Sequence, residues 1–239
     1  MSIDLVLIPG LNNTAAVWDA VLPVIGAESA RVGKVVSCHT ATNPAMDTVE
    51  ELARHWLNNL PLRFHLVGFS FGGYVALAML EFAPERIAGL TMMCTGAGAD
   101  SPQQVATREA AIDRALAGEY ESMIGAQAAA AFHPDSLSDA ALMQRRMDMV
   151  KDYGAQRFAA HARAAARRPD RSALLRAYAG PLQFIAGSHD KLFAPEAMRA
   201  MAVAAGRGTD VEVIDGAGHL LPMERPAELA KVLVDRGGR

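Results

Sequence analysis

The chain has 239 residues, a formal net charge of −3 and 51% hydrophobic residues. A chain of this length can form one domain with an insertion, and it can bury a core that needs no disulfide or metal. The near-neutral charge argues against a nucleic-acid partner. No apolar run reaches the roughly 18 residues that a membrane-spanning helix needs, so we expect no membrane span.

The first part of the chain alternates strand patterns with helix patterns. Thr14 is a plausible N-cap, because its side chain can accept a backbone N–H of the following turn. The expected elements are a strand over 3–8 that ends at Pro9-Gly10, a helix over 15–25, a strand over 32–38 and a helix over 45–58. Such alternation predicts a parallel sheet with right-handed crossovers and ligands at the carboxyl ends of its strands.

The centre of the chain carries the pattern G-x-S-x-G in Gly68-Phe69-Ser70-Phe71-Gly72. An apolar strand over 62–67 precedes this pattern, and a helix that is apolar on all sides follows it. This context predicts a nucleophile elbow, in which Ser70 lies on a strained strand-to-helix turn. Gly68 and Gly72 are required sterically, because side chains at these positions would collide with the chain. The helix should be buried.

The second half begins with a strand over 87–94 and then loses the strand pattern. We expect about four helices, near 102–117, 119–131, 137–151 and 154–168, before the strand pattern returns. The remaining elements are a strand over 182–187, a helix over 195–205, a strand over 211–214 and a helix over 226–234. We therefore predict an α/β fold with a mostly parallel sheet of about six strands flanked by helices. Residues 1–97 and 177–239 form the predicted core, and residues 98–176 form an all-helical cap.

Candidate partners for Ser70 follow it in the chain. Asp190 comes just after the strand over 182–187, and His219 comes just after the strand over 211–214, so both lie at carboxyl ends of strands. A serine hydroxyl needs a neighbouring base, which His219 would supply while Asp190 orients the imidazole. His189 and Asp215 are alternatives, but the first adjoins Asp190 on a loop and the second suits a turn. The strand over 87–94 offers no acid until Asp100, and Cys94 lacks an elbow that would make it a nucleophile.

Four segments together resemble the α/β-hydrolase superfamily. They are Ile8-Pro9-Gly10-Leu11, Gly68-Phe69-Ser70-Phe71-Gly72-Gly73, Gly187-Ser188-His189-Asp190, and Gly216-Ala217-Gly218-His219 followed by Met223-Glu224-Arg225-Pro226. The resemblance places the helical cap over the active site. The backbone N–H groups of Leu11 and Phe71 are then the expected oxyanion hole, and the chemistry requires no metal and no cofactor.

The sequence departs from the superfamily pattern at two places. Pro9 stands where many members have His, which should leave the backbone donor intact. Many members also begin with a hairpin that is missing here, and the short start resembles the plant methylesterase and hydroxynitrile-lyase branch. We predict a serine hydrolase that cleaves a carboxylic ester, thioester or lactone of a small molecule. The alternatives are carbon–carbon bond hydrolysis, a hydroxynitrile-type lyase, and a ligand-binding receptor with vestigial activity.

The cap sequence gives two indications about the substrate. Residues 141–176 hold nine Arg or Lys residues against three Asp residues. Either these basic residues form a solvated face, or one of the arginines binds a substrate carboxylate. Met143, Met147 and Val150 share a helical face, which serves either packing or an adaptable acyl pocket. We expect a small-molecule substrate, and the arginine interpretation predicts an anionic one.

Cysteine usage and the N-terminal residues bear on the cellular location. Cys38 and Cys94 each lie near the end of a predicted strand. In a strand order where these two strands are not neighbours the cysteines cannot bridge, and we expect them to be reduced thiols. The chain enters its first strand with no basic segment before it, which predicts the absence of a signal peptide. We expect a cytoplasmic protein that is a monomer or a homodimer.

Overall fold

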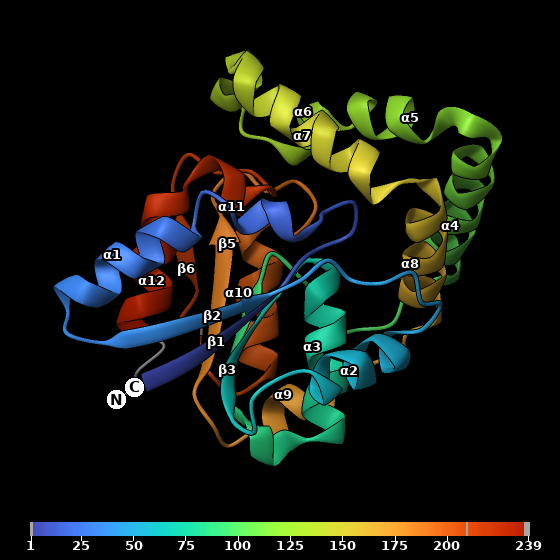
Figure 1. Ribbon diagram of the computed structural model, residues 1–239. Coiled ribbons are helices and arrows are strands. Elements are labelled where there is room, and N and C mark those ends of the chain that lie inside the picture. Colours follow the sequence, from blue (N-terminus) through green and yellow to red (C-terminus); the bar gives the residue numbers. More distant parts are fainter. Residues whose placement is uncertain (1, 209, 237–239) are drawn as a thin grey trace.

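A computed structural model describes residues 2–208 and 210–236 of the chain. These residues form a six-stranded sheet in the order β2-β1-β3-β4-β5-β6, and every neighbouring pair is parallel (Figure 1). Its strands are β1 (Ser2–Ile8), β2 (Val35–Thr40), β3 (Phe64–Phe69), β4 (Ile87–Met93), β5 (Leu182–Gly187) and β6 (Glu212–Ile214). The predicted α/β fold with a parallel sheet of about six strands is confirmed.

Helices cover both faces of this sheet, as the alternation of side chains along β1 requires. Val6 and Ile8 pack in one apolar cluster, with α2 (Val49–Asn58), α3 (Phe71–Phe82), α9 (Ser172–Ala177) and α10 (Pro195–Ala204). Leu5 and Leu7 pack in the other, with α1 (Leu22–Arg31) and α12 (Pro226–Arg236). Figure 1 shows α1 and α12 on one side of the strands and α2 and α3 on the other.

Helix α3 is the most deeply buried of these helices, as its apolar sequence predicts. Residues 71–80 are all buried. Because α3 starts directly after Ser70, the packing of the whole helix fixes the position of that serine.

The segment between β4 and β5 contains helices and no strand. In order it holds α4 (Pro102–Arg114), the π-helical turn η3 (Ala115–Glu119), α5 (Tyr120–Ala126), α6 (Ala128–Ala131), the 3₁₀ turn η4 (Pro134–Ser138), α7 (Ala140–Tyr153), α8 (Ala155–Arg167) and α9. Side chains of α4, α5, α7 and α8 form a third apolar cluster that includes Ile112, Ile124, Val150 and Phe158. The helices α4 to α8 arch beyond the sheet in Figure 1. Their separation as a cap domain stays a prediction.

The structure corrects the predicted helix over 15–25. Residues Ala15–Trp18 form a 3₁₀ turn, η1, and α1 starts only at Leu22. Pro23 explains the break, because proline has no N–H to donate and its ring clashes with the carbonyl four residues earlier. The side chain of Thr14 does cap η1, by accepting the Ala16 N–H.

Other boundaries differ by a few residues. Strand β2 begins at Val35 because Gly33, with φ of 66°, follows the end of α1. Helix α2 begins at Val49, where Thr48 supplies the N-cap by accepting the Glu51 N–H. The structure adds the 3₁₀ turn η2 (Pro84–Arg86) and the short helix α11 (Leu221–Glu224), which the sequence pattern did not indicate.

The two cysteines are free, as predicted, because β1 and β3 separate β2 from β4. Across the residues that the structure covers, we find no helix with both the length and the apolar character needed to cross a lipid bilayer.

Candidate active site

Ser70 occupies the tight turn between β3 and α3. Its backbone has φ of 52° and ψ of −119°, a conformation that side chains disfavour. Two contacts hold this turn: the Ser70 N–H donates to the Met93 carbonyl (2.9 Å), and its carbonyl accepts the Thr95 hydroxyl (2.6 Å). The turn is therefore anchored to the end of β4.

The glycines of the elbow are sterically required, as predicted. A Cβ atom on Gly68 would lie 2.6 Å from the Cα of Gly73, and one on Gly72 would lie 2.3 Å from the carbonyl oxygen of Ile8. Both distances are far below ordinary contact, and the obstructing atoms are backbone. These glycines let α3 approach β3 and β1 closely enough to present Ser70 at the sheet edge.

The structure brings Ser70, His219 and Asp190 into one hydrogen-bonded chain. His219 Nε2 lies 3.0 Å from Ser70 Oγ, and His219 Nδ1 lies 2.9 Å from Asp190 Oδ2. Asp190 Oδ1 accepts the backbone N–H groups of Leu192 and Phe193 at 2.8 and 2.9 Å. This is the geometry in which an imidazole can remove a proton from a serine hydroxyl.

Asp190 is suited to remain ionised beside His219. Burial alone would raise the pKa of this carboxyl, but the hydrogen bond and charge of His219 and the two backbone N–H groups outweigh burial and lower the pKa. A carboxylate in this place holds Nδ1 of the imidazole protonated, so that Nε2 faces Ser70 as a base.

The expected oxyanion donors lie at the same carboxyl end of the sheet as Ser70. Leu11 and Phe71 both line the cavity that contains Ser70. Neither backbone N–H donates a hydrogen bond to another residue in the described ranges. The loop that carries Leu11 is shaped by Asn12, whose φ is 60°, and by Asn13, whose side-chain amide donates to the Leu11 carbonyl (2.7 Å).

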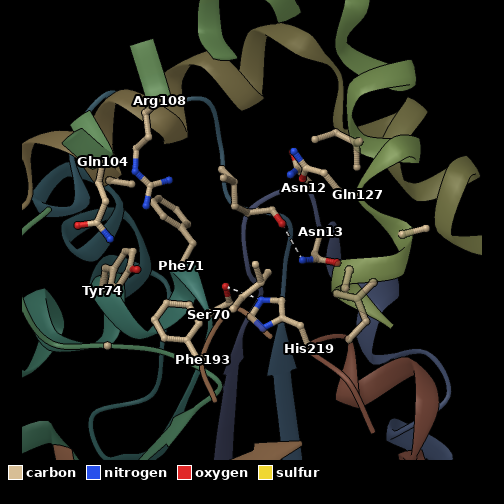
Figure 2. A pocket seen from close by; sticks show the side chains of 18 of the residues that line it. Asn12, Asn13, Ser70, Phe71, Tyr74, Gln104, Arg108, Gln127, Phe193 and His219 are labelled. Carbon is tan, nitrogen blue, oxygen red and sulfur yellow. Dashed lines mark hydrogen bonds between the residues drawn. The ribbon is translucent and has the colours of Figure 1, made fainter. Parts of the chain in front are cut away.

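The cavity above Ser70 measures about 730 Å³, a size typical of sites for small molecules. Ser70 and His219 lie at its base in Figure 2, between a side with Gln104, Arg108 and Tyr74 and a side with Asn12, Asn13 and Gln127. Apolar atoms from the helical segment complete the walls, among them those of Ile124, Ala128, Ala131, Met143 and Met147.

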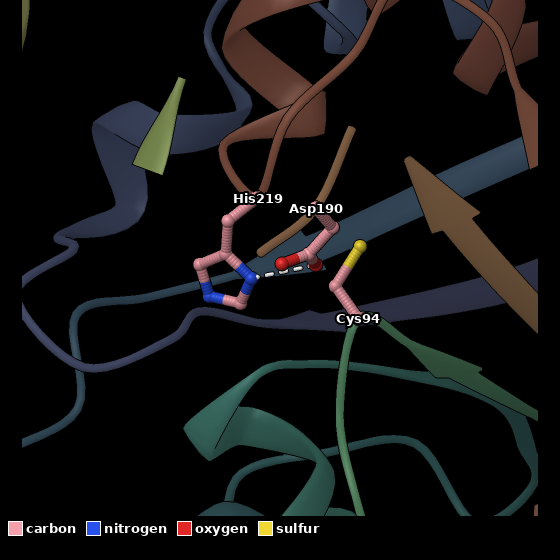
Figure 3. A group of neighbouring side chains, drawn as sticks. All are labelled: Cys94, Asp190 and His219. Atoms are coloured by element: carbon pink, nitrogen blue, oxygen red, sulfur yellow. Dashed lines mark hydrogen bonds and ion pairs between the residues drawn. The ribbon is translucent and has the colours of Figure 1, made fainter. Parts of the chain in front are cut away.

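Cys94, Asp190 and His219 form a group whose ligand atoms lie within 4.8 Å of one another (Figure 3). Metal binding does not suit this group. His219 Nδ1 and both oxygens of Asp190 are engaged in the hydrogen bonds described above. Burial, together with the nearby charge of Asp190, raises the pKa of the Cys94 thiol well above its ordinary value, so it does not offer a thiolate.

The alternative candidates lie elsewhere. His189 is exposed and packs edge-on against His133, with ring centroids 4.2 Å apart. Asp215 lies in the turn that follows β6, as predicted. Asp100 lines the cavity but pairs with Arg108 (2.5 Å) and Arg168 (2.7 Å).

Two supporting residues were missed in the sequence. Thr95 holds the Ser70 carbonyl, and a lone threonine after a strand gives no signal of such a role. Glu224 accepts the Gly218 N–H next to His219 (2.8 Å), and also the His133 N–H (2.7 Å) and the Ser136 hydroxyl (2.8 Å). Glu224 did belong to a segment that carried the resemblance, which was its only signal.

Comparisons with known proteins bear on the family and the fold. A family model described as the alpha/beta hydrolase family matches residues 5–232. A pimeloyl-[acyl-carrier protein] methyl ester esterase from Nitrosomonas europaea is 30% identical over 94 residues, which span 38% of this chain and 37% of that esterase.

Solved structures match nearly the whole chain. A thermophilic esterase from Thermogutta terrifontis, solved with malate bound, is 25% identical with a TM-score of 0.81, covering 98% of this chain and 88% of its own. The enol-lactonase from Burkholderia xenovorans LB400 is 20% identical with a TM-score of 0.80, covering 98% and 91%. The second likeness establishes the fold alone.

Proposed function

The chain belongs to the alpha/beta hydrolase family, and from this premise we propose that it is a serine hydrolase. Its substrate is a carboxylic ester, thioester or lactone of a small molecule. The hydrogen-bonded chain from Ser70 through His219 to Asp190 is the observation that carries the proposal. The esterase activities of the relatives from Nitrosomonas europaea and Thermogutta terrifontis support the same class of reaction.

The proposed reaction has two halves. In the first, Ser70 Oγ forms a bond to the acyl carbon while His219 Nε2 takes the hydroxyl proton, and the bond to the leaving oxygen or sulfur then breaks as His219 returns that proton. In the second, His219 removes a proton from water, which attacks the acyl-serine and frees the acid and Ser70. The negative charge that develops on the carbonyl oxygen is stabilised by the N–H groups of Leu11 and Phe71. Each such donor contributes roughly 10²–10³ in rate.

The experiment combines covalent labelling with turnover. A fluorophosphonate probe with peptide mapping is expected to modify Ser70, and p-nitrophenyl esters are expected to be hydrolysed. Ser70→Ala should lower kcat by at least roughly 10³-fold, because the nucleophile is lost. Ser122→Ala, at an exposed serine of α5, is the matched control and should keep wild-type activity.

A folded wild-type protein that takes no label and cleaves no ester would contradict the proposal. The three remaining interpretations then have their own readouts, and cleavage of a carbon–carbon bond in a diketone-like substrate indicates the carbon–carbon bond hydrolase. Cleavage of a cyanohydrin without an acyl-serine indicates a lyase, whereas thermal stabilisation by ligands without turnover indicates a receptor. Cytoplasmic location and monomeric or homodimeric state stay predictions.

A further inference from the structure

Arg146 is a buried cation in the wall of the cavity. It projects from α7, is 9% exposed and lines the same space as Ser70. Its Nη1 group donates to the Asn12 carbonyl (2.6 Å) and to the Asn13 side-chain oxygen (3.0 Å). One edge of the guanidinium is thus fixed on the loop that carries Leu11.

The charge of Arg146 has no acidic partner. In the part of the chain that the structure describes, no carboxylate forms an ion pair with it, and its Nε and Nη2 groups donate no hydrogen bond. The ionisable groups that act on its charge are the phenols of Tyr120 and Tyr153, and both are neutral at pH 7 because burial raises their pKa values. Burial lowers the pKa of Arg146 to about 10, so the guanidinium remains protonated at neutral pH.

The other arginines of the cavity differ from Arg146 in this respect. Arg108 and Arg168 share the carboxylate of Asp100, and Arg168 also lies over the Tyr74 ring, 3.8 Å from its centroid. The cavity-lining residues therefore carry three guanidinium groups against one carboxylate. The excess positive charge favours an anion in the cavity.

We propose that Arg146 binds an anionic group, a carboxylate, on the substrate of the hydrolytic reaction proposed above. A buried guanidinium without a counter-charge is costly, and a bound carboxylate removes that cost. The free edge of the guanidinium matches the two oxygens of a carboxylate. The inference depends on the proposed function for the reaction itself, and it adds the class of substrate.

The residues around Arg146 indicate what the rest of such a substrate looks like. Met143 and Met147 lie three residues before and one residue after it on α7, and both line the cavity. They supply an apolar wall beside the charge. The site therefore fits an ester or lactone in which an apolar spacer separates the reacting carbonyl from a free carboxylate.

The test compares paired substrates on paired variants. p-Nitrophenyl monoesters of succinic, glutaric and adipic acid carry a free carboxylate, and their methyl-capped counterparts are neutral. Wild type is expected to prefer the anionic member of at least one pair. Arg146→Met should reduce this preference, measured as the ratio of the two kcat/KM values, by roughly 30- to 1000-fold, as expected for loss of one partner of a buried charge pair. Arg145→Met, at an exposed arginine beside it on α7, should leave the ratio unchanged.

The ratio of the two kcat/KM values distinguishes a role of Arg146 in binding the carboxylate from a role in supporting the loop that carries Leu11. Arg146→Met could disturb Leu11, but that disturbance affects both members of a pair equally. An unchanged ratio in a folded Arg146→Met protein would overturn the proposal. Calorimetric binding of glutarate to Ser70→Ala, and its loss in Ser70→Ala/Arg146→Met, gives a second readout that needs no turnover. If glutarate binds through Arg146 but no ester is cleaved, only the proposed function is contradicted. If esters are cleaved but glutarate does not bind and the anionic substrates are not preferred, only this inference is contradicted.

Discussion

Ser70 adopts a backbone conformation that costs free energy, and the surrounding residues hold it there. Conformations of this kind cost about 1–3 kcal/mol for a residue with a side chain. The Met93 carbonyl, the Thr95 hydroxyl and the buried helix α3 all fix the turn. The strained serine is stable because its neighbours determine its position from both sides.

Gly72→Ala is expected to destabilise the protein by at least about 2 kcal/mol, because the new Cβ would lie 2.3 Å from the Ile8 carbonyl oxygen. The control is Gly26→Ala in α1, where nothing lies within 4 Å of the new Cβ. That change should stabilise the helix by about 0.5–1 kcal/mol. Urea unfolding followed by circular dichroism measures both. Equal midpoints for Gly72→Ala and wild type would contradict the steric argument.

Helix α11 shows how one short element organises the loops around the site. It is only four residues long, Leu221–Glu224, but its last residue accepts three hydrogen bonds. Two of these come from the His133–Ser136 region, at the start of η4, and one comes from Gly218. The carboxylate of Glu224 therefore joins the loop of His219 to the helical segment above the sheet.

Glu224→Gln is expected to lower the free energy of unfolding by about 2 kcal/mol and to affect kcat more strongly than it affects KM. An amide keeps the shape of the side chain but turns an N–H group toward donors that need an acceptor, which leaves a buried donor unsatisfied. Glu228→Gln, on the exposed face of α12, is the control and should behave as wild type. Thermal unfolding and p-nitrophenyl ester kinetics are the measurements. A Glu224→Gln protein with wild-type melting and kinetics would show that these contacts are dispensable.

At the scale of the whole molecule, buried polar contacts join the helical segment between β4 and β5 to the rest of the fold. His161 of α8 is fully buried, donates through Nε2 to the Pro44 carbonyl (2.6 Å), and accepts the Tyr153 hydroxyl at Nδ1. Its ring also stacks on Phe71, with centroids 5.0 Å apart. A neutral imidazole satisfies both contacts, whereas a protonated one has no acceptor left for the tyrosine.

This contact makes the stability of the protein depend on pH. Burial, assisted by the charge of Arg157, lowers the pKa of His161 to about 4, although the Pro44 carbonyl and Asp47 act in the opposite direction. Between about pH 6.5 and 4 the unfolded chain therefore binds the proton more readily than the folded one. The contribution of neutral His161 to the free energy of unfolding is complete above pH 6.5, and it falls by roughly 3 kcal/mol as the pH drops to 4.

Urea unfolding at several pH values tests this dependence. Wild type should lose more of its unfolding free energy between pH 7 and 4.5 than His161→Gln does. His55→Gln, at an exposed histidine of α2, should follow wild type. Parallel pH curves for wild type and His161→Gln would refute the assignment of this loss to His161.

The sequence by itself determined the architecture and the three residues that the structure joins at the edge of the sheet. Apolar strands, buried helices and the glycines of the elbow are local features, and a short stretch of sequence is enough to predict each of them. Asp190 and His219 could be selected because the carboxyl ends of parallel strands meet at one edge. The break in the predicted helix over 15–25 was also local, and Pro23 was visible in the sequence as its cause.

Only the tertiary structure decided which residues support that site. Arg146 is one of nine basic residues between 141 and 176, and helical spacing puts it, unlike Arg145, on the face of Met143 and Met147, but the sequence does not show what that face meets. The fold buries one and exposes the other, and it brings the buried one to a loop more than 130 positions earlier. Thr95, Glu224 and His161 likewise have partners distant in the chain. Such contacts depend on how separate elements pack, and a single sequence carries no periodic signal for them.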